Sequence, residues 1–209
     1  MFREDRPTTT RGLVTLSSPA LALQADPACG GKLRSLVSLR SGREYFYQDT
    51  RPAFDGTKGY SYHDISGCDE CFPTVAPCQG RTSDGRAYDY ADHGSLWQGR
   101  WEVRDDGDAL DMSCEACDAN CAFLRRCSFL AEDTLRLEYR IRNLGSAAMP
   151  FVYQKQVLIA HASRRDGVRT LLVCQLGNLQ HIHALKTPGL TEQAAAGLQV
   201  VACRDAVLP

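Results

Sequence analysis

The segment that decides the fold class is LRLEYRIR, residues 135–142. Apolar and charged residues alternate along it, with Leu135, Leu137, Tyr139 and Ile141 on one side and Arg136, Glu138, Arg140 and Arg142 on the other. Strict alternation is the pattern of a β-strand that has one buried face and one solvated face. The segment therefore predicts a strand of an antiparallel sheet.

Similar short runs recur on both sides of this segment, with turn residues between them. The predicted strands are residues 13–16, 21–25, 32–39, 44–48, 101–104, 110–114, 123–130, 135–142, 151–160 and 168–172. The acidic, glycine-containing turn at residues 105–108 predicts a hairpin between the strands that flank it. Only residues 191–197 (TEQAAAG) have the pattern of a helical turn. Regularly spaced strands predict an all-β sandwich or barrel in a single domain, residues 1–209.

Residues 49–92 differ from the rest of the chain. They are rich in Gly, Pro, Asp, Tyr and Cys and show little periodicity. Irregular stretches of this length are uncommon in compact domains, and when they are ordered they are usually functional. We expect this stretch to form a loop layer over a sheet.

Composition excludes several classes of function. The chain has 209 residues and a formal net charge of -1, so it has no excess of positive charge for nucleic acid or for an anionic membrane. No apolar run approaches the roughly 20 residues that a membrane-spanning helix needs. The first ten residues are polar and have no apolar stretch typical of a signal peptide, so we expect a cytoplasmic protein.

Ten cysteines are many for a chain of this kind. Without a secretory signal they are expected to be reduced thiols. Cys68-x-x-Cys71 and Cys114-x-x-Cys117 have the spacing of zinc ligands, so a structural zinc site is one alternative. The 42 residues between the two pairs exceed common zinc-ribbon spacing. We therefore expect no bound metal.

Five blocks, read in order, resemble the galactose mutarotase-like (aldose 1-epimerase-like) family. They are Gly30-Gly31-Lys32-Leu33 with Gly42-Arg43-Glu44, residues 67–73 (GCDECFP), Asp92-His93-Gly94 with Trp97 and Trp101, residues 135–143 ending at Asn143, and Met149-Pro150-Phe151. The resemblance covers residues 12–162 and leaves residues 163–209 unmatched. It implies an antiparallel β-supersandwich, which we expect to be shortened at its C-terminal end.

The resemblance also implies a reaction. In a mutarotase an acid protonates the sugar ring oxygen while a base removes the proton of the anomeric hydroxyl, which is general acid–base catalysis. His93 lies at the family's His-Gly motif and is expected to be the acid. Gly94 allows a close backbone approach there, and Asp92 can orient the imidazole. The implied partner is an aldose, and no cofactor is needed.

Two family positions differ in this chain. Gln156 falls where the family has a second histidine, and glutamine cannot transfer protons as imidazole does. His161 is five residues further on, an odd offset that points it to the opposite face of a strand. The family's late glutamate base has no match, and Glu192 is the only glutamate after residue 167. These departures predict low activity.

Other residues are candidates for sugar binding. The adjacent carboxylates Asp69 and Glu70 can bind sugar hydroxyls or replace the missing base; the alternative is a solvated acidic loop. Trp97 and Trp101, four residues apart, are predicted on one face of a strand, with stacking on sugar for one and core packing for the other.

The leading function is therefore a weak aldose 1-epimerase-like isomerase. One alternative is a catalytically inactive carbohydrate-binding protein, which the glutamine at position 156 and the missing glutamate favour. The other is a zinc-stabilised interaction domain, which metal content would reveal.

Overall fold

A computed structural model describes residues 12–51, 55–116, 118–157, 171–174 and 199–202, the last two segments by their backbone alone. Almost all regular structure in these residues is β-strand. The strand pairings are antiparallel except for the two that β13 makes, with β10 and β12. The prediction of an all-β, largely antiparallel fold is confirmed.

The first sheet has five strands. Their order is β1 (Val14–Ser17), β2 (Leu21–Asp26), β3 (Lys32–Ser38), β4 (Cys68–Cys71) and β11 (Gln154–Val157). β1, β2 and β3 follow one another through short turns, whereas β4 and β11 come from distant parts of the chain. β11 pairs with β4 so that Gln156 lies opposite Asp69, and Lys155 lies opposite Glu70.

The second sheet has six strands. Their order is β12 (Leu171–Cys174), β13 (Gln199–Ala202), β10 (Thr134–Asn143), β9 (Cys121–Ala131), β8 (Ala109–Ala116) and β7 (Glu102–Asp105). β10 contains the alternating segment, and its residues Leu135, Leu137 and Tyr139 are buried as predicted. β7 and β8 form the predicted hairpin across the acidic turn.

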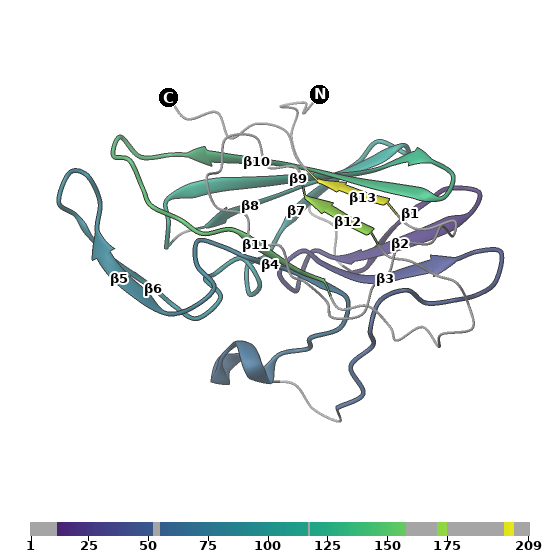
Figure 1. Cartoon of the computed structure of the whole chain (residues 1–209), viewed down its shortest axis with the longest axis horizontal. Coiled ribbons are helices and arrows are strands. Elements are labelled where there is room, and N and C mark those ends of the chain that lie inside the picture. The colour runs from purple at the N-terminus through teal and green to yellow at the C-terminus, as the bar shows by residue number, and fades with distance from the viewer. Residues whose placement is uncertain (1–11, 52–54, 117, 158–170, 175–198, 203–209) are drawn as a thin grey trace.

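The hydrophobic core lies where the two sheets face each other (Figure 1). Leu23, Leu33 and Leu36 come from the five-stranded sheet, and Leu110 and Phe123 come from the six-stranded sheet. All five are fully buried. Figure 1 also shows that the chain between β3 and β4 runs on the far side of the five-stranded sheet, away from the six-stranded sheet. We call the described residues of this segment the covering layer.

The expectation of an irregular stretch at residues 49–92 is wrong in part. The 3₁₀ turns η1 (Gly56–Lys58) and η2 (Tyr60–Tyr62) lie in the covering layer, but β4 is an inner strand of the sheet. β5 (Cys78–Arg81) and β6 (Ala87–Tyr90) form a separate hairpin. β4 has no apolar alternation because charged partners cover both of its faces.

The strand predicted at residues 44–48 is reduced to one bridge, between Glu44 and Val37. The Glu44 carboxylate accepts hydrogen bonds from the backbone N–H groups of Leu36 and Phe46. It thereby takes the place of ladder partners that a longer strand would use. The helical turn predicted at residues 191–197 lies outside the described residues. Among the described residues, none forms a helix with the length and apolarity that crossing a membrane requires.

Candidate functional site

The candidate site is built on the outer face of β4, the face turned away from the six-stranded sheet. Side chains alternate along a strand, so Asp69 and Cys71 point outward while Cys68 and Glu70 point between the sheets. All four residues are buried. The strand therefore presents one carboxylate to each side.

Asp69 is the centre of a buried polar cluster on the outer face. Lys32 donates from Nζ to Asp69 Oδ2 over 2.7 Å and to the Ser66 carbonyl oxygen over 3.1 Å. His63 Nε2 lies 2.9 Å from the same carboxylate oxygen. Lys32, His63 and Asp69 are all almost completely buried. Burial of these polar side chains is tolerated because each of the three has a hydrogen-bond partner or a partner of opposite charge.

His63 has both ring nitrogens engaged. Nε2 contacts the Asp69 carboxylate, and Nδ1 contacts the backbone carbonyl oxygen of Tyr60. Both partners are hydrogen-bond acceptors, so the ring satisfies both only when both nitrogens carry protons.

Tyr60 joins this cluster to two predicted site residues. Its hydroxyl donates to Gln156 Oε1 over 2.8 Å and lies 3.4 Å from Asp69 Oδ2. Its ring stacks on His93, with ring centroids 3.7 Å apart and an interplanar angle of 3°. Burial raises the pKa of Tyr60 far above its ordinary value, so the hydroxyl is a hydrogen-bond donor at neutral pH.

His93 is the most accessible imidazole of the cluster, with a quarter of its side chain exposed. Its Nδ1 lies 3.0 Å from Asp92 Oδ1. The backbone at Gly94 has a φ of +67°, and a Cβ there would lie 1.9 Å from the Phe72 carbonyl oxygen. Only glycine fits, which confirms the close approach predicted for the His-Gly motif. The contact holds His93 beside the end of β4.

The two tryptophans do not share a strand face, so that expectation is wrong. The turn bonds Gln98 N–H to Ser95 and Gly99 N–H to Leu96 place Trp97 in a tight bend. Trp97 packs edge-on against Tyr60, with centroids 5.3 Å apart, and is almost fully buried. Trp101 is a core residue, as one of the pair was predicted to be.

Glu70 is separated from the Asp69 cluster by the sheet itself. It is fully buried and binds four partners from other strands and loops: Arg125 at 2.8 Å, Lys155 at 2.7 Å, Tyr139 at 3.1 Å and Tyr153 at 2.7 Å. Although burial acts to raise it, Lys155 and Arg125 hold the pKa of Glu70 down at about 2. The alternative of a solvated acidic loop is therefore wrong for both carboxylates.

The sequence did not single out Lys32, Tyr60 or His63 as site residues. Lys32 begins a strand, and nothing near it in the chain marks a buried lysine. Tyr60 and His63 lie in the stretch whose length and composition indicated function, and this was the only available signal. His161 and Glu192, the candidates for the missing histidine and base, lie outside the described residues.

The geometry of the first cysteine pair, Cys68 and Cys71, does not fit the zinc alternative. Cys68 and Cys71 lie on opposite faces of β4, so they cannot bind the same ion. Burial raises the pKa of Cys68 to about 11 and that of Cys71 to about 12, which keeps both as neutral thiols. Within the described ranges no three His, Cys, Asp or Glu side chains gather as a metal site. Cys117 is outside those ranges.

Chemically, the outer face of β4 offers two imidazoles, a carboxylate, an ammonium and a phenol in contact with one another. Imidazole and carboxylate groups are those that most often move protons in enzymes. Gln156 adds an amide that can bind a hydroxyl group. Comparison of the chain with models of protein families, with curated proteins and with solved structures gives no match.

Proposed function

We propose that this chain binds an aldose at the outer face of β4 and interconverts its anomers slowly. The observation that carries the proposal is the chain of contacts from Asp69 to His63 and Tyr60, with His93 stacked on Tyr60. These contacts bring together a carboxylate and two imidazoles, which are among the side chains that most often act as general acids and bases. The resemblance of residues 12–162 to the galactose mutarotase-like family supports a sugar as the substrate.

In the proposed reaction His93 gives a proton to the ring oxygen of the sugar while Asp69 takes the proton of the anomeric hydroxyl. The bond between the anomeric carbon and the ring oxygen breaks, and the anomeric carbon becomes the carbonyl of the open-chain aldehyde. Rotation of the aldehyde and reversal of the two proton transfers close the ring as the other anomer. His93 and Asp69 return to their starting states.

Four further side chains support His93 and Asp69. His63 and Lys32 hold the Asp69 carboxylate in place. Gln156 uses its oxygen on Tyr60, so its NH₂ group is the part that can donate to a sugar hydroxyl. Trp97 packs edge-on against the Tyr60 ring and holds it in the position in which it stacks on His93.

The rate is expected to be low. Asp69 is almost completely buried and bound by Lys32 and His63, so a sugar hydroxyl reaches its carboxylate only when neighbouring side chains move. Gln156 cannot substitute for an acid or a base. The second candidate function, a sugar-binding protein without catalysis, is favoured by this same glutamine.

Polarimetry tests the proposal. Fresh α-D-glucose and α-D-galactose are expected to reach their equilibrium rotation faster with the protein than without it. His93→Ala and Asp69→Asn should remove the acceleration, whereas Asp108→Asn, on the exposed turn between β7 and β8, should retain it. No acceleration by the wild-type chain, together with binding of methyl glycosides at β4, would establish the second candidate instead. Absence of both acceleration and binding would overturn both.

A further inference from the structure

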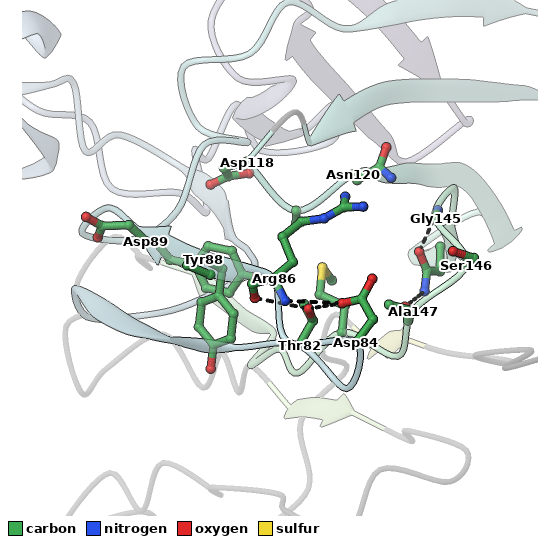
Figure 2. Close-up of a pocket in the computed structure, with 15 residues that line it drawn as sticks. Thr82, Asp84, Arg86, Tyr88, Asp89, Asp118, Asn120, Gly145, Ser146 and Ala147 are labelled. Carbon is green, nitrogen blue, oxygen red and sulfur yellow. Dashed lines mark hydrogen bonds between the residues drawn. The ribbon is translucent and has the colours of Figure 1, made fainter.

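A hollow of about 300 Å³ lies beside the β5–β6 hairpin, and none of its lining residues belongs to the Asp69 cluster (Figure 2). Its walls come from three segments: the hairpin residues 82–90, the turn 118–120 and the turn 143–149. The volume is at the lower end of the range for small-molecule sites. The hollow is therefore large enough for a ligand the size of one sugar ring.

Several polar groups of the lining already have partners. The Asp84 carboxylate accepts from the Thr82 hydroxyl and from the Arg86 backbone N–H. Asn143 holds the turn that follows β10, since its amide donates to Ala147 and its oxygen accepts from Gly145. Asp84 and Asn143 therefore stabilise the walls of the hollow, and ligand contacts are expected from other lining residues.

Arg86 is the principal candidate for a ligand contact. Its side chain is exposed and rises from the hairpin into the hollow between Asp118 and Asn120 (Figure 2). In the part of the chain that the structure describes, its guanidinium makes no ion pair. Asp118 accepts a hydrogen bond from the Ser95 hydroxyl at 2.5 Å, and its residue is exposed beside the hollow, where the carboxylate can accept a further hydrogen bond from a ligand. Asn120, in a left-handed turn conformation, is exposed at the rim.

We infer that this hollow binds a neutral polyhydroxylated ligand, one sugar ring in size, as a site separate from the one proposed for catalysis. Guanidinium, carboxylate and carboxamide groups are planar, and each can bind two neighbouring hydroxyls at once. Arg86 supplies donors, Asp118 supplies an acceptor and Asn120 supplies both. Met149 and the Tyr88 ring add apolar surface for the C–H face of a sugar.

The charge of the lining argues against an anionic ligand. It contains three carboxylates, those of Asp84, Asp89 and Asp118, and one guanidinium, that of Arg86, so the formal sum is -3 + 1 = -2. A phosphate or carboxylate would gain from Arg86 but would meet this excess of negative charge. A neutral polyol avoids the repulsion and can still accept hydrogen bonds from Arg86 and donate hydrogen bonds to Asp118.

Methyl α-D-glucopyranoside and methyl β-D-galactopyranoside are suitable probes because their blocked anomeric carbon prevents ring opening. We expect either glycoside to shift backbone amide resonances of residues 82–90, 118–120 and 143–149 in a two-dimensional ¹H–¹⁵N titration of the full chain. Arg86→Gln should weaken this binding by about tenfold, equivalent to roughly 1.4 kcal/mol, the size of one good hydrogen-bond partner. Arg81→Gln, in the same hairpin but outside the lining, is the matched control and should bind as the wild type does.

Three results would overturn the inference: no shifts at these residues with either glycoside, unchanged affinity in Arg86→Gln, or tighter binding of inorganic phosphate or spermidine than of a glycoside at this hollow. The titration also separates this site from the proposed catalytic one. Amides of Tyr60, His63 and Gly94 report on the Asp69 cluster. Shifts confined to them would disprove the second site while leaving the proposed function intact.

Discussion

Asp69 and Glu70 are consecutive residues whose carboxylates lie on opposite sides of β4, each against its own set of basic side chains. Asp69 meets Lys32 and His63 on the outer face, and Glu70 meets Arg125 and Lys155 between the sheets. β4 thus contributes the Asp69 carboxylate to the candidate site and the Glu70 carboxylate to the space between the sheets. Substitution of Glu70 is expected to lower stability, whereas Asp69→Asn, which leaves the buried Lys32 without a counter-charge, is expected to lower both activity and stability.

Glu70→Gln is expected to lower the free energy of unfolding by about 3–5 kcal/mol. The reason is that Arg125 and Lys155 would stay buried without a counter-charge. Urea denaturation followed by circular dichroism measures the loss. The control Glu102→Gln changes an exposed side chain on β7 and should alter stability by less than about 0.5 kcal/mol. Equal stability of the two variants would contradict a structural role for Glu70.

Glu70 also predicts how stability depends on pH. Its pKa in the folded chain, about 2, lies below the ordinary value of 4.5. The stabilisation that the Glu70 carboxylate provides is therefore complete above about pH 4.5, and it is lost as the pH falls from about 4.5 toward 2. We expect a slope in this window of up to roughly 1.4 kcal/mol per pH unit from this group. Urea unfolding at several pH values should show a smaller slope in Glu70→Gln; equal slopes would assign the acid sensitivity to other carboxylates.

The difference between β10 and β4 explains how much of the fold the sequence could predict. β10 alternates because its buried face is apolar, and that pattern is local. β4 has the sequence CDEC, and its burial depends on ion pairs with distant residues. Asp69 pairs with Lys32, which is 37 residues away along the chain. Glu70 pairs with Arg125 and Lys155, which are 55 and 85 residues away. No local pattern records such pairs, so β4 was predicted as part of a loop.

The site was predictable to a similar extent. The close backbone approach at Gly94 was predicted from the His-Gly motif. Gln156 was predicted within a strand over residues 151–160, and it lies in β11; its pairing with Asp69 was not predicted. His63 and Tyr60 were not predicted, because their positions depend on how an irregular segment folds over the sheet. Glu70 was grouped with Asp69 because strand alternation was not recognised in that segment.

Gly94→Ala tests the close approach beneath His93. Both Gly94 and Gly107 have a positive φ, but a Cβ at Gly107 meets no atom within 4 Å, whereas one at Gly94 meets the Phe72 carbonyl oxygen. Gly107→Ala should therefore cost only the backbone strain, about 1–2 kcal/mol. Gly94→Ala should cost at least about 2 kcal/mol more, because the loop must move away from β4. Denaturant unfolding of both variants decides this, and similar losses would show that the loop is not held by this contact.

The stack of His93 on Tyr60 can be separated from the hydrogen bond that Tyr60 makes. Tyr60→Phe keeps the ring beneath His93 and removes only the hydroxyl that donates to Gln156, whereas Tyr60→Leu removes the ring. If the proposed reaction takes place, His93→Ala should slow mutarotation by about 10²–10⁴-fold, the usual contribution of a general acid. Tyr60→Leu should approach that loss because the imidazole is no longer held in place, and Tyr60→Phe should lose less than about tenfold, as expected for one hydrogen bond. Polarimetry on α-D-galactose compares the three variants, with urea denaturation to confirm that each is folded. Equal losses in the two Tyr60 variants would show that the hydroxyl, and not the stacked ring, is what the reaction needs from Tyr60.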